Sequence, residues 1–213
     1  MGRVVAAGGP GETSTTIGVA VSTFALPLAP TAIRRNTIAA KLALVVGGAA
    51  LIALCAQISI PLPFTPVPIT GQTFAVLLVG SALGAMLGLA STALYVLVGI
   101  IGAPVYADGA HGWSVITSAT GGYLVGFMLA GVLVGLLAQL GWDRKFSTAS
   151  GSMLAGNVVV YLVGLPWLAV VLNTNLDKTL EYGLYPFVVG DVLKLYLAAA
   201  VLPAAWKAVK HFR

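Results

Sequence analysis

The sequence predicts an all-α integral membrane protein, a bundle of six transmembrane helices with both the N and the C terminus in the cytoplasm. The first observation is composition: 59% of the 213 residues are hydrophobic and 8% are charged, whereas a soluble domain carries about 25% charged residues. The second is a series of apolar segments long enough to cross a hydrocarbon core about 30 Å thick. The third is the distribution of basic residues, which fall on one side of the membrane when six spans are counted.

The same composition excludes several classes of protein. The 11 Lys and Arg and 6 Asp and Glu residues are too few to cover a water-soluble globule, which excludes a cytosolic enzyme and a disordered regulator. The basic residues form no stripe with interleaved aromatic residues, so no nucleic-acid partner is expected despite the net charge of +5. With Cys55 as the single cysteine and only two histidines, neither a disulfide framework nor a metal site or cofactor is expected.

Residues 1–33 differ in composition from the rest of the chain, because they are rich in Gly, Ser, Thr and Pro. They predict a disordered N-terminal leader, followed by a six-helix membrane domain over 34–213. A cleavable signal peptide is the alternative. Against it, Pro27 and Pro30 interrupt the apolar stretch, and the strongly positive pair follows this stretch instead of preceding it.

Six apolar segments predict the spans. The first ends at the prolines of 61–68, which cannot continue a helix. The uncharged stretch at 69–103 is too long for one helix, so it divides into two short spans at the small-residue segment GSALGAMLG. Polar stretches separate the remaining three spans. The predicted spans are 36–59, 70–84, 85–102, 118–140, 150–172 and 185–206.

Basic residues in the short loops predict the orientation, because Lys and Arg are retained on the cytoplasmic side. They precede the first span, separate the fourth from the fifth, and follow the sixth, whereas the opposite side keeps only Lys178. Both termini are therefore predicted to be cytoplasmic, in a multi-pass protein of the cytoplasmic membrane. The basic residues on the cytoplasmic side are Arg34, Arg35, Arg144, Lys145, Lys207, Lys210 and Arg213.

The strongest functional candidates are Asp191 and Lys194, in the segment PFVVGDVLKLYLAAAV. A charged residue inside a membrane helix costs about 2.5–3.5 kcal/mol on insertion scales, which makes it a functional candidate. The two residues are three apart and share one helix face. If the helix begins near Pro186, Asp191 lies about 7 Å and Lys194 about 12 Å along it, in the outer half of the bilayer. The alternative is an ion pair that neutralises itself for structural reasons alone.

Further candidates lie at the same outer end. Gln72, in PVPITGQTF, offers an amide to a polar ligand, although it could simply cap a helix. The loop YADGAHGW brings together Tyr106, Asp108, His111 and Trp113, of which the histidine could be merely solvated. Tyr123, in TSATGGYLVGF, offers an aromatic face and a hydroxyl, although the neighbouring glycines also suit plain helix packing. Asn157 and Tyr161 are interpreted as hydrogen-bonding groups between helices.

Motifs for catalysis are missing from the sequence. No GxxxxGK[ST] segment is present, so the chain cannot hydrolyse ATP itself. An intramembrane enzyme that uses Asp191 and Lys194 as acid and base is the alternative, but a second catalytic group is lacking. The sequence therefore predicts a binding subunit that is not an enzyme, or one driven by a partner.

At these residues the sequence resembles the BioY family, the biotin-binding S components of energy-coupling-factor transporters. The matching segments are AQISIPLPFTPVPITGQTFAVLLVG, GIIGAPVYADGAHGW, TSATGGYLVGF and PFVVGDVLK, and the resemblance covers about residues 40–200. The sequence departs from the family pattern at Ala110, where the family usually has a polar residue, and at Ala119, where it usually has a proline. An S component for another vitamin is the runner-up.

The resemblance implies high-affinity biotin binding, and uptake energised by partner ATPases. Asp191 and Lys194 would contact biotin, and Tyr123, Trp113 and Tyr106 would cover its ring and chain. The family couples to a transmembrane subunit and two ATP-binding subunits through small residues on the first helix. Ala49 and Ala53 are the expected contact residues here, with Gly47, Gly48 and Ala50 nearby; internal or lipid-facing packing of these residues is the alternative.

Overall fold

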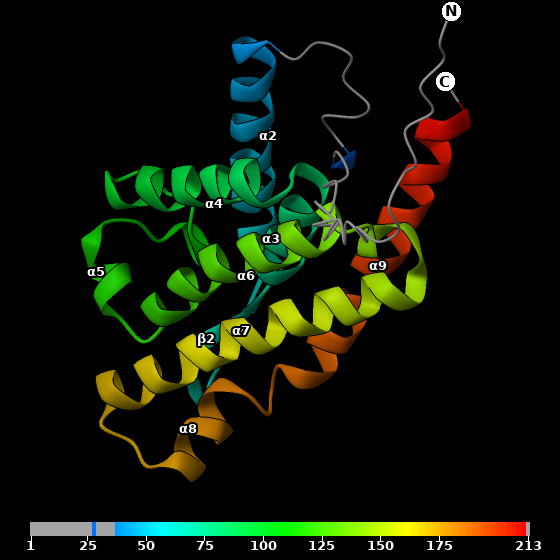
Figure 1. Cartoon of the computed structure of the whole chain (residues 1–213). Helices are drawn as coiled ribbons and strands as arrows, with labels where there is room; N and C mark the ends of the chain where they lie inside the picture. The colour runs from blue at the N-terminus through cyan, green and yellow to red at the C-terminus, as the bar shows by residue number, and fades with distance from the viewer. Residues whose placement is uncertain (1–26, 29–36, 212–213) are drawn as a thin grey trace, which may run out of the picture.

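The computed structural model describes residues 27–28 and 37–211, and over these residues the chain is mostly helical (Figure 1). Four helices are long and apolar enough to cross a membrane, namely α2, α6, α7 and α9, and two apolar helices, α3 and α4, are shorter. The chain is therefore a multi-pass membrane protein. The helices are α2 (Ile38–Ala56), α3 (Gln72–Leu83), α4 (Ala85–Ile100), α5 (Trp113–Thr117), α6 (Gly121–Gln139), α7 (Phe146–Leu172), α8 (Leu176–Gly183) and α9 (Val188–His211), with 3-10 turns η1 (Ala107–Gly109) and η2 (Trp142–Arg144).

The fold is not exclusively helical, which corrects the all-α prediction. Strands β1 (Ser59–Leu62) and β2 (Thr65–Thr70) form an antiparallel hairpin in the proline-rich segment, with Ser59 opposite Thr70. A two-stranded ribbon has a free edge on each strand, and proline is tolerated at such edges because no ladder hydrogen bond is lost. The prolines that follow α2 are therefore compatible with a strand pair.

The predicted break in the second apolar stretch lies at Gly84, between α3 and α4. This residue has φ of +81°, a conformation that favours glycine because it has no Cβ atom. A Cβ atom at Gly88 would lie 2.8 Å from Gly80 Cα, so α3 and α4 approach each other through small residues. The short spans predicted at 70–84 and 85–102 correspond to these two helices.

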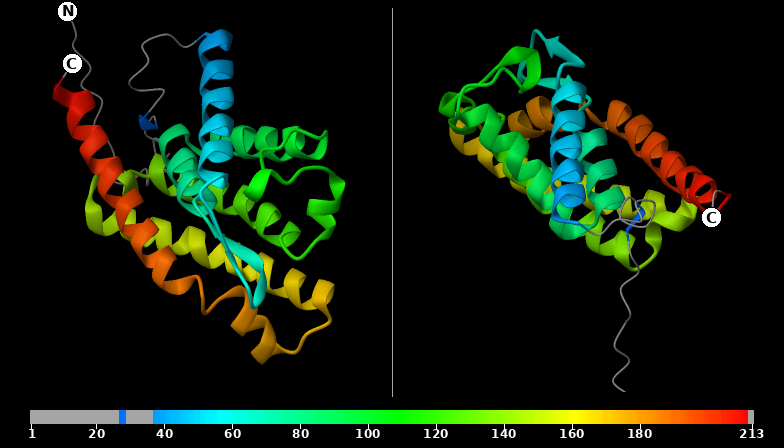
Figure 2. Two further views of the ribbon diagram at one scale, coloured as in Figure 1. Left: turned by 180° about the vertical axis from the view of Figure 1, so that it is seen from behind. Right: turned by 90° about the horizontal axis from the view of Figure 1, so that it is seen from above.

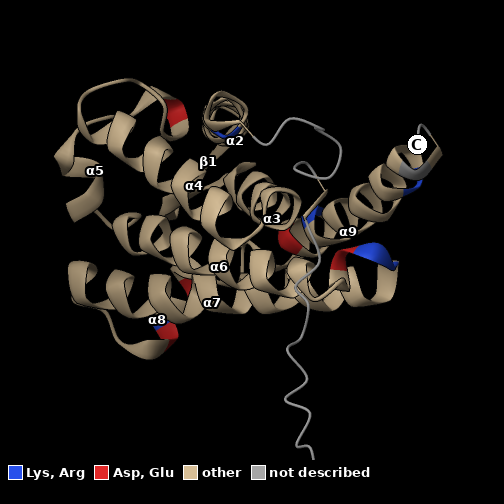
Figure 3. Ribbon diagram, turned by 45° about the horizontal axis from the view of Figure 1, so that its top comes forward, with Lys and Arg blue, Asp and Glu red and all other residues tan. Residues whose placement is uncertain are grey.

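The helices form one bundle around a shared core, with α6 and α7 side by side at its centre (Figures 1 and 2). The hairpin, α5 and α8 gather at one end of the bundle, which we call the hairpin end. The η2 turn and the end of α9 lie at the opposite end, which we call the η2 end. Figure 3 shows α2 along its axis while α7 runs across the view, so α2 crosses α7 steeply.

Of the predicted leader, only Pro27 and Leu28 belong to the described residues. Both are buried, and Pro27 lies beside Gly84. The rest of the segment predicted as disordered lies outside the described residues.

Candidate functional site

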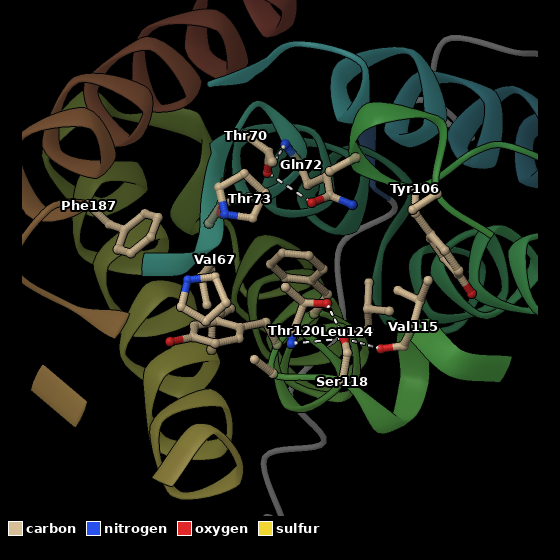
Figure 4. Close-up of a pocket in the computed structure, with 18 of the residues that line it drawn as sticks. Val67, Thr70, Gln72, Thr73, Tyr106, Val115, Ser118, Thr120, Leu124 and Phe187 are labelled. Carbon is tan, nitrogen blue, oxygen red and sulfur yellow. Dashed lines mark hydrogen bonds between the residues drawn. The ribbon is translucent and has the colours of Figure 1, made fainter. Parts of the chain in front are cut away.

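A cavity of about 610 Å³ opens at the hairpin end of the bundle. It is enclosed by β2, the first turn of α3, the 106–110 loop, α5, α6, α7 and the start of α9. Apolar side chains such as Val67, Leu124 and Phe187 form much of its wall, and Thr70, Ser118 and Thr120 add hydroxyl groups (Figure 4). A mostly apolar pocket with a few polar groups, in this size range, is typical of small-molecule sites.

Asp191 and Lys194 line this cavity from the first turns of α9. Lys194 Nζ donates to Asp191 Oδ1 at 2.9 Å, and the two side chains are 18% and 8% exposed, respectively. The Tyr161 hydroxyl, on α7, donates to Asp191 Oδ2. A lysine ammonium has three donors, so Lys194 can bind a ligand acceptor without releasing the aspartate.

Gln72 also lines the cavity, at the first residue of α3. Its Nε2 donates to the Tyr95 hydroxyl at 2.5 Å, and its Oε1 accepts from Thr70 Oγ1 at 2.9 Å. The side chain does not cap the helix, because Thr70 Oγ1 instead accepts the Gln72 backbone N–H at 3.3 Å. The amide is therefore held by α4 and β2 at the cavity wall.

Tyr106 and Tyr123 line the cavity with their rings. The Tyr106 hydroxyl donates to the Val96 carbonyl at 2.6 Å, and the Tyr123 hydroxyl donates to the Gly183 carbonyl at 3.0 Å. Burial also raises the pKa of the Tyr106 phenol. Because both hydroxyls bond the backbone, the aromatic faces are what these residues offer a ligand.

His111 and Trp113 are not brought together with the other candidates. Neither lines the cavity, and Trp113 is 63% exposed. The His111 ring nitrogen Nδ1 lies 3.2 Å from the Gly109 carbonyl oxygen, in an exposed position. Their neighbours Ala110 and Ser114 line the cavity instead. Ligand contact by His111 or Trp113 stays a prediction.

Two further lining residues, Tyr161 and Asp108, stand out in the sequence but were not predicted as ligand contacts. Tyr161 was interpreted as an interhelical group, and it does bond α9, but it does so inside the cavity. Asp108 also lines the cavity, and its Oδ2 accepts from Ser59 Oγ at 3.1 Å. Only the aspartate carries a sequence signal, as a charge in a glycine-containing loop; the position of Tyr161 depends on how α7 meets α9.

The predicted coupling residues on α2 do not face outward. Ala49 is buried, and Ala53 is partly buried against the core. This part of α2 packs closely against α4, because a Cβ atom added at the neighbouring Gly48 would lie 2.5 Å from Ser91 Oγ. The small residues exposed on α2 include Gly47 and Ala50. Contact of Ala49 with a partner would require α2 to leave its present packing.

A comparison with known proteins identifies the family. The sequence profile described as the BioY family matches residues 20–211. The chain belongs to the BioY family. This confirms the resemblance inferred from the motifs.

BioY relatives extend over most of this chain. The biotin transporter of Thermotoga maritima is 40% identical over 152 residues, which are 71% of this chain and 87% of that protein. The biotin transporter of Lactococcus lactis subsp. cremoris is 32% identical over 180 residues, 83% of this chain and 96% of that protein. These relatives are named as transporters, in agreement with the prediction that the chain is not an enzyme.

A solved structure shares the fold of this BioY protein. It is the S component for biotin from an ECF-type ABC transporter, with a TM-score of 0.74 and 27% identity, covering 82% of this chain and 95% of that chain.

Proposed function

We propose that this chain binds biotin in the cavity at the hairpin end and acts as the substrate-binding S component of an energy-coupling-factor transporter in the cytoplasmic membrane. The observation that carries the proposal is the Asp191–Lys194 pair, which lines a largely apolar cavity. Removal of an ion pair from water is costly, and apolar residues would often fill the same volume with equal or greater stability. A ligand that uses both charges gives the pair a function.

The chemistry of biotin matches the groups on the cavity wall. The ureido ring has N–H donors for the Asp191 carboxylate and a carbonyl acceptor for the Lys194 ammonium. The thiophane ring and the aliphatic chain are apolar and suit the rings of Tyr123 and Tyr106. Gln72 adds a polar group to the wall. In the alternative pose, Lys194 binds the biotin carboxylate instead.

The proposed topology has six spans and both termini in the cytoplasm. Four long apolar helices and two shorter ones support the count. Arg144 and Lys145 lie near the η2 end, and Lys178 lies on α8 at the hairpin end. In a variant lacking Cys55, a membrane-impermeant thiol reagent should label K178C in intact cells and K145C only after permeabilisation. The reverse labelling would overturn this orientation.

The proposed partners are a transmembrane coupling subunit and two ATP-binding subunits. Transport needs an energy source, and the sequence lacks a phosphate-binding loop. On α2, the exposed Gly47 and Ala50 provide small residues that allow close approach of another helix, with Ala53 at the edge of this surface and Ala49 behind it.

Equilibrium binding of radiolabelled biotin to the purified full chain tests the proposal. The wild-type protein should bind saturably, and Asp191→Asn should lose most of its affinity. Asp177→Asn, an exposed aspartate on α8 that does not line the cavity, is the matched control and should bind like wild type. Absence of saturable binding by the wild-type protein would refute the proposal, and preference for another vitamin in competition would assign a different substrate.

A further inference from the structure

The charges on the cavity wall are unevenly distributed. Within the part of the chain that the structure describes, three charged side chains line the cavity: Asp108, Asp191 and Lys194. The only cation among them, Lys194, is held by Asp191 at 2.9 Å. The remaining charge, Asp108, is negative. The described wall therefore has no second cation to receive a ligand carboxylate.

The Asp191–Lys194 pair and Asp108 come from different elements, α9 and η1, and the residues beside these elements lie on opposite sides of the cavity. Phe187, whose carbonyl accepts the Asp191 backbone N–H at 2.8 Å, lies on one side in Figure 4, with Tyr106 and Val115 on the other. Asp108 follows Tyr106 by two residues and is exposed, so this side of the cavity reaches the surface. A ligand whose polar head occupies the Asp191–Lys194 pair extends its other end toward this rim.

The rim offers neutral groups and one negative charge. Ser118 Oγ donates to the Val115 carbonyl at 2.7 Å and lies 2.9 Å from Thr120 Oγ1, so these hydroxyls already bond within the protein. Asp108 would repel an acid, although solvent screens an exposed charge of this kind. Nothing in this arrangement favours a charged tail over a neutral one.

From this wall we infer that the site admits biotin amides and esters, in which the acid of the tail is blocked, as well as biotin itself. The inference rests on the proposed function, because it takes the ureido head to the Asp191–Lys194 pair. The inference extends the substrate class to biotin conjugates that are joined through the carboxyl group of biotin. The cavity volume of about 610 Å³ and its exposed rim leave room for such a substituent.

Competition binding on the purified full chain tests this inference. Unlabelled biotin, biotinamide and biotin methyl ester each compete with radiolabelled biotin. The two neutral derivatives should bind within about tenfold of the acid, because loss of an exposed, solvated charge changes little. A loss of more than about a hundredfold would overturn the inference, since it would mean that a cation such as Lys194 recognises the acid.

A second experiment uses a variant of Asp108, the charged residue at the rim. Asp108 has φ of +57°, which asparagine tolerates, and the Asn amide oxygen can still accept from Ser59 Oγ. In Asp108→Asn, the affinity for biotin should rise about two- to threefold relative to biotinamide at low salt, whereas Asp177→Asn should leave this ratio unchanged. An unchanged ratio in Asp108→Asn would contradict the placement of the tail.

The outcomes separate the two proposals. If radiolabelled biotin does not bind saturably, the proposed function fails, and the inference fails with it. If biotin binds saturably but neither neutral derivative displaces it, the inference alone fails.

Discussion

The Tyr161 hydroxyl, on α7, donates a hydrogen bond to Asp191 Oδ2, on α9, although the two residues are 30 positions apart in the sequence. Lys194 donates to the other carboxylate oxygen at 2.9 Å. One carboxylate is thereby held from two helices, and its orientation in the cavity is fixed before a ligand arrives. Such preorganisation lowers the entropic cost of binding, because the protein has less freedom left to lose.

Substitution of Tyr161 by Phe should weaken biotin binding while leaving the fold intact. The variant keeps the ring that packs edge-on against Tyr123 at 6.4 Å and removes only the hydroxyl. Loss of a hydrogen bond to a charged group should lower the affinity by about tenfold to a hundredfold. Tyr196→Phe is the matched control, because Tyr196 stacks on Phe146 and does not line the cavity. Equal affinities for both variants and wild type would show that Tyr161 does not position Asp191 for the ligand.

Removal of one member of the Asp191–Lys194 pair should cost both affinity and stability. A buried charge without its partner destabilises a protein by about 3–5 kcal/mol, whereas replacement of both charges is often neutral. The double variant Asp191→Asn/Lys194→Met should therefore have a thermal unfolding midpoint near that of wild type but bind little biotin. Lys194→Ala should weaken biotin binding more than Gln72→Ala does. The opposite order would move the polar end of the site toward α3.

Helix existence was predictable from the sequence, but helix ends were less so. The last span, predicted at 185–206, corresponds to α9 over Val188–His211, and the fifth, predicted at 150–172, begins earlier, at Phe146. Apolar length identifies a span, whereas its ends depend on local capping and on contacts with neighbouring elements. The amphipathic α8 (Leu176–Gly183) lies in a polar stretch between two predicted spans, and it is too short to be predicted as a span.

The hairpin and the Tyr161 contact needed the three-dimensional structure. Closely spaced prolines indicate that a helix ends, but they do not show that β1 and β2 pair with each other. Likewise, Asp191 was predictable because a charge in a membrane helix is unusual, whereas Tyr161 is an ordinary residue in an apolar span. Its role depends on the packing of α7 against α9, which a single sequence does not reveal.

At the η2 end, Asp143 should make the stability of the protein depend on pH. Trp206 Nε1 donates to its Oδ2 at 2.5 Å, while Oδ1 is buried without a hydrogen-bond partner among the described residues. Burial raises the pKa of the Asp143 carboxyl in the folded state above its ordinary value, despite the Trp206 hydrogen bond. The folded state then holds this proton more tightly than the unfolded state, so stability should fall as the pH rises from the ordinary aspartate pKa through the folded-state pKa.

Thermal unfolding of Asp143→Asn over a pH series from about 4 to about 8 checks this dependence. Asparagine can still accept from Trp206 but does not ionise in this range. The difference in melting temperature between Asp143→Asn and wild type should therefore grow in favour of the variant as the pH rises. Parallel pH profiles for the two proteins would contradict the prediction.

Two glycines should respond in opposite ways to the same substitution. A Cβ atom at Gly135, on α6, would lie 2.4 Å from Ala85 N, which is backbone and cannot move aside. Gly135→Ala should therefore destabilise the protein by about 1–3 kcal/mol through overpacking. At Gly47, on α2, nothing lies within 4 Å of an added Cβ atom, so Gly47→Ala should leave the melting temperature unchanged or raise it. Similar losses at both positions would contradict the packing of α2 and α6.

A substitution at Gly47 should separate biotin binding from transport. Gly47 is exposed on α2 and does not line the cavity. The lining residue nearest to it in the sequence is Pro66. If a coupling subunit packs on the small residues Gly47 and Ala50, a bulky side chain there should prevent close approach of the two helices. Gly47→Phe should therefore bind radiolabelled biotin like wild type in purified form, yet support less biotin uptake in cells that contain the coupling and ATP-binding subunits.

Leu42→Phe, at an exposed position on the same helix that already carries a large side chain, is the control and should retain uptake. Full uptake by Gly47→Phe would exclude this face of α2 as the coupling surface, because a phenylalanine ring cannot be accommodated where two helix backbones meet.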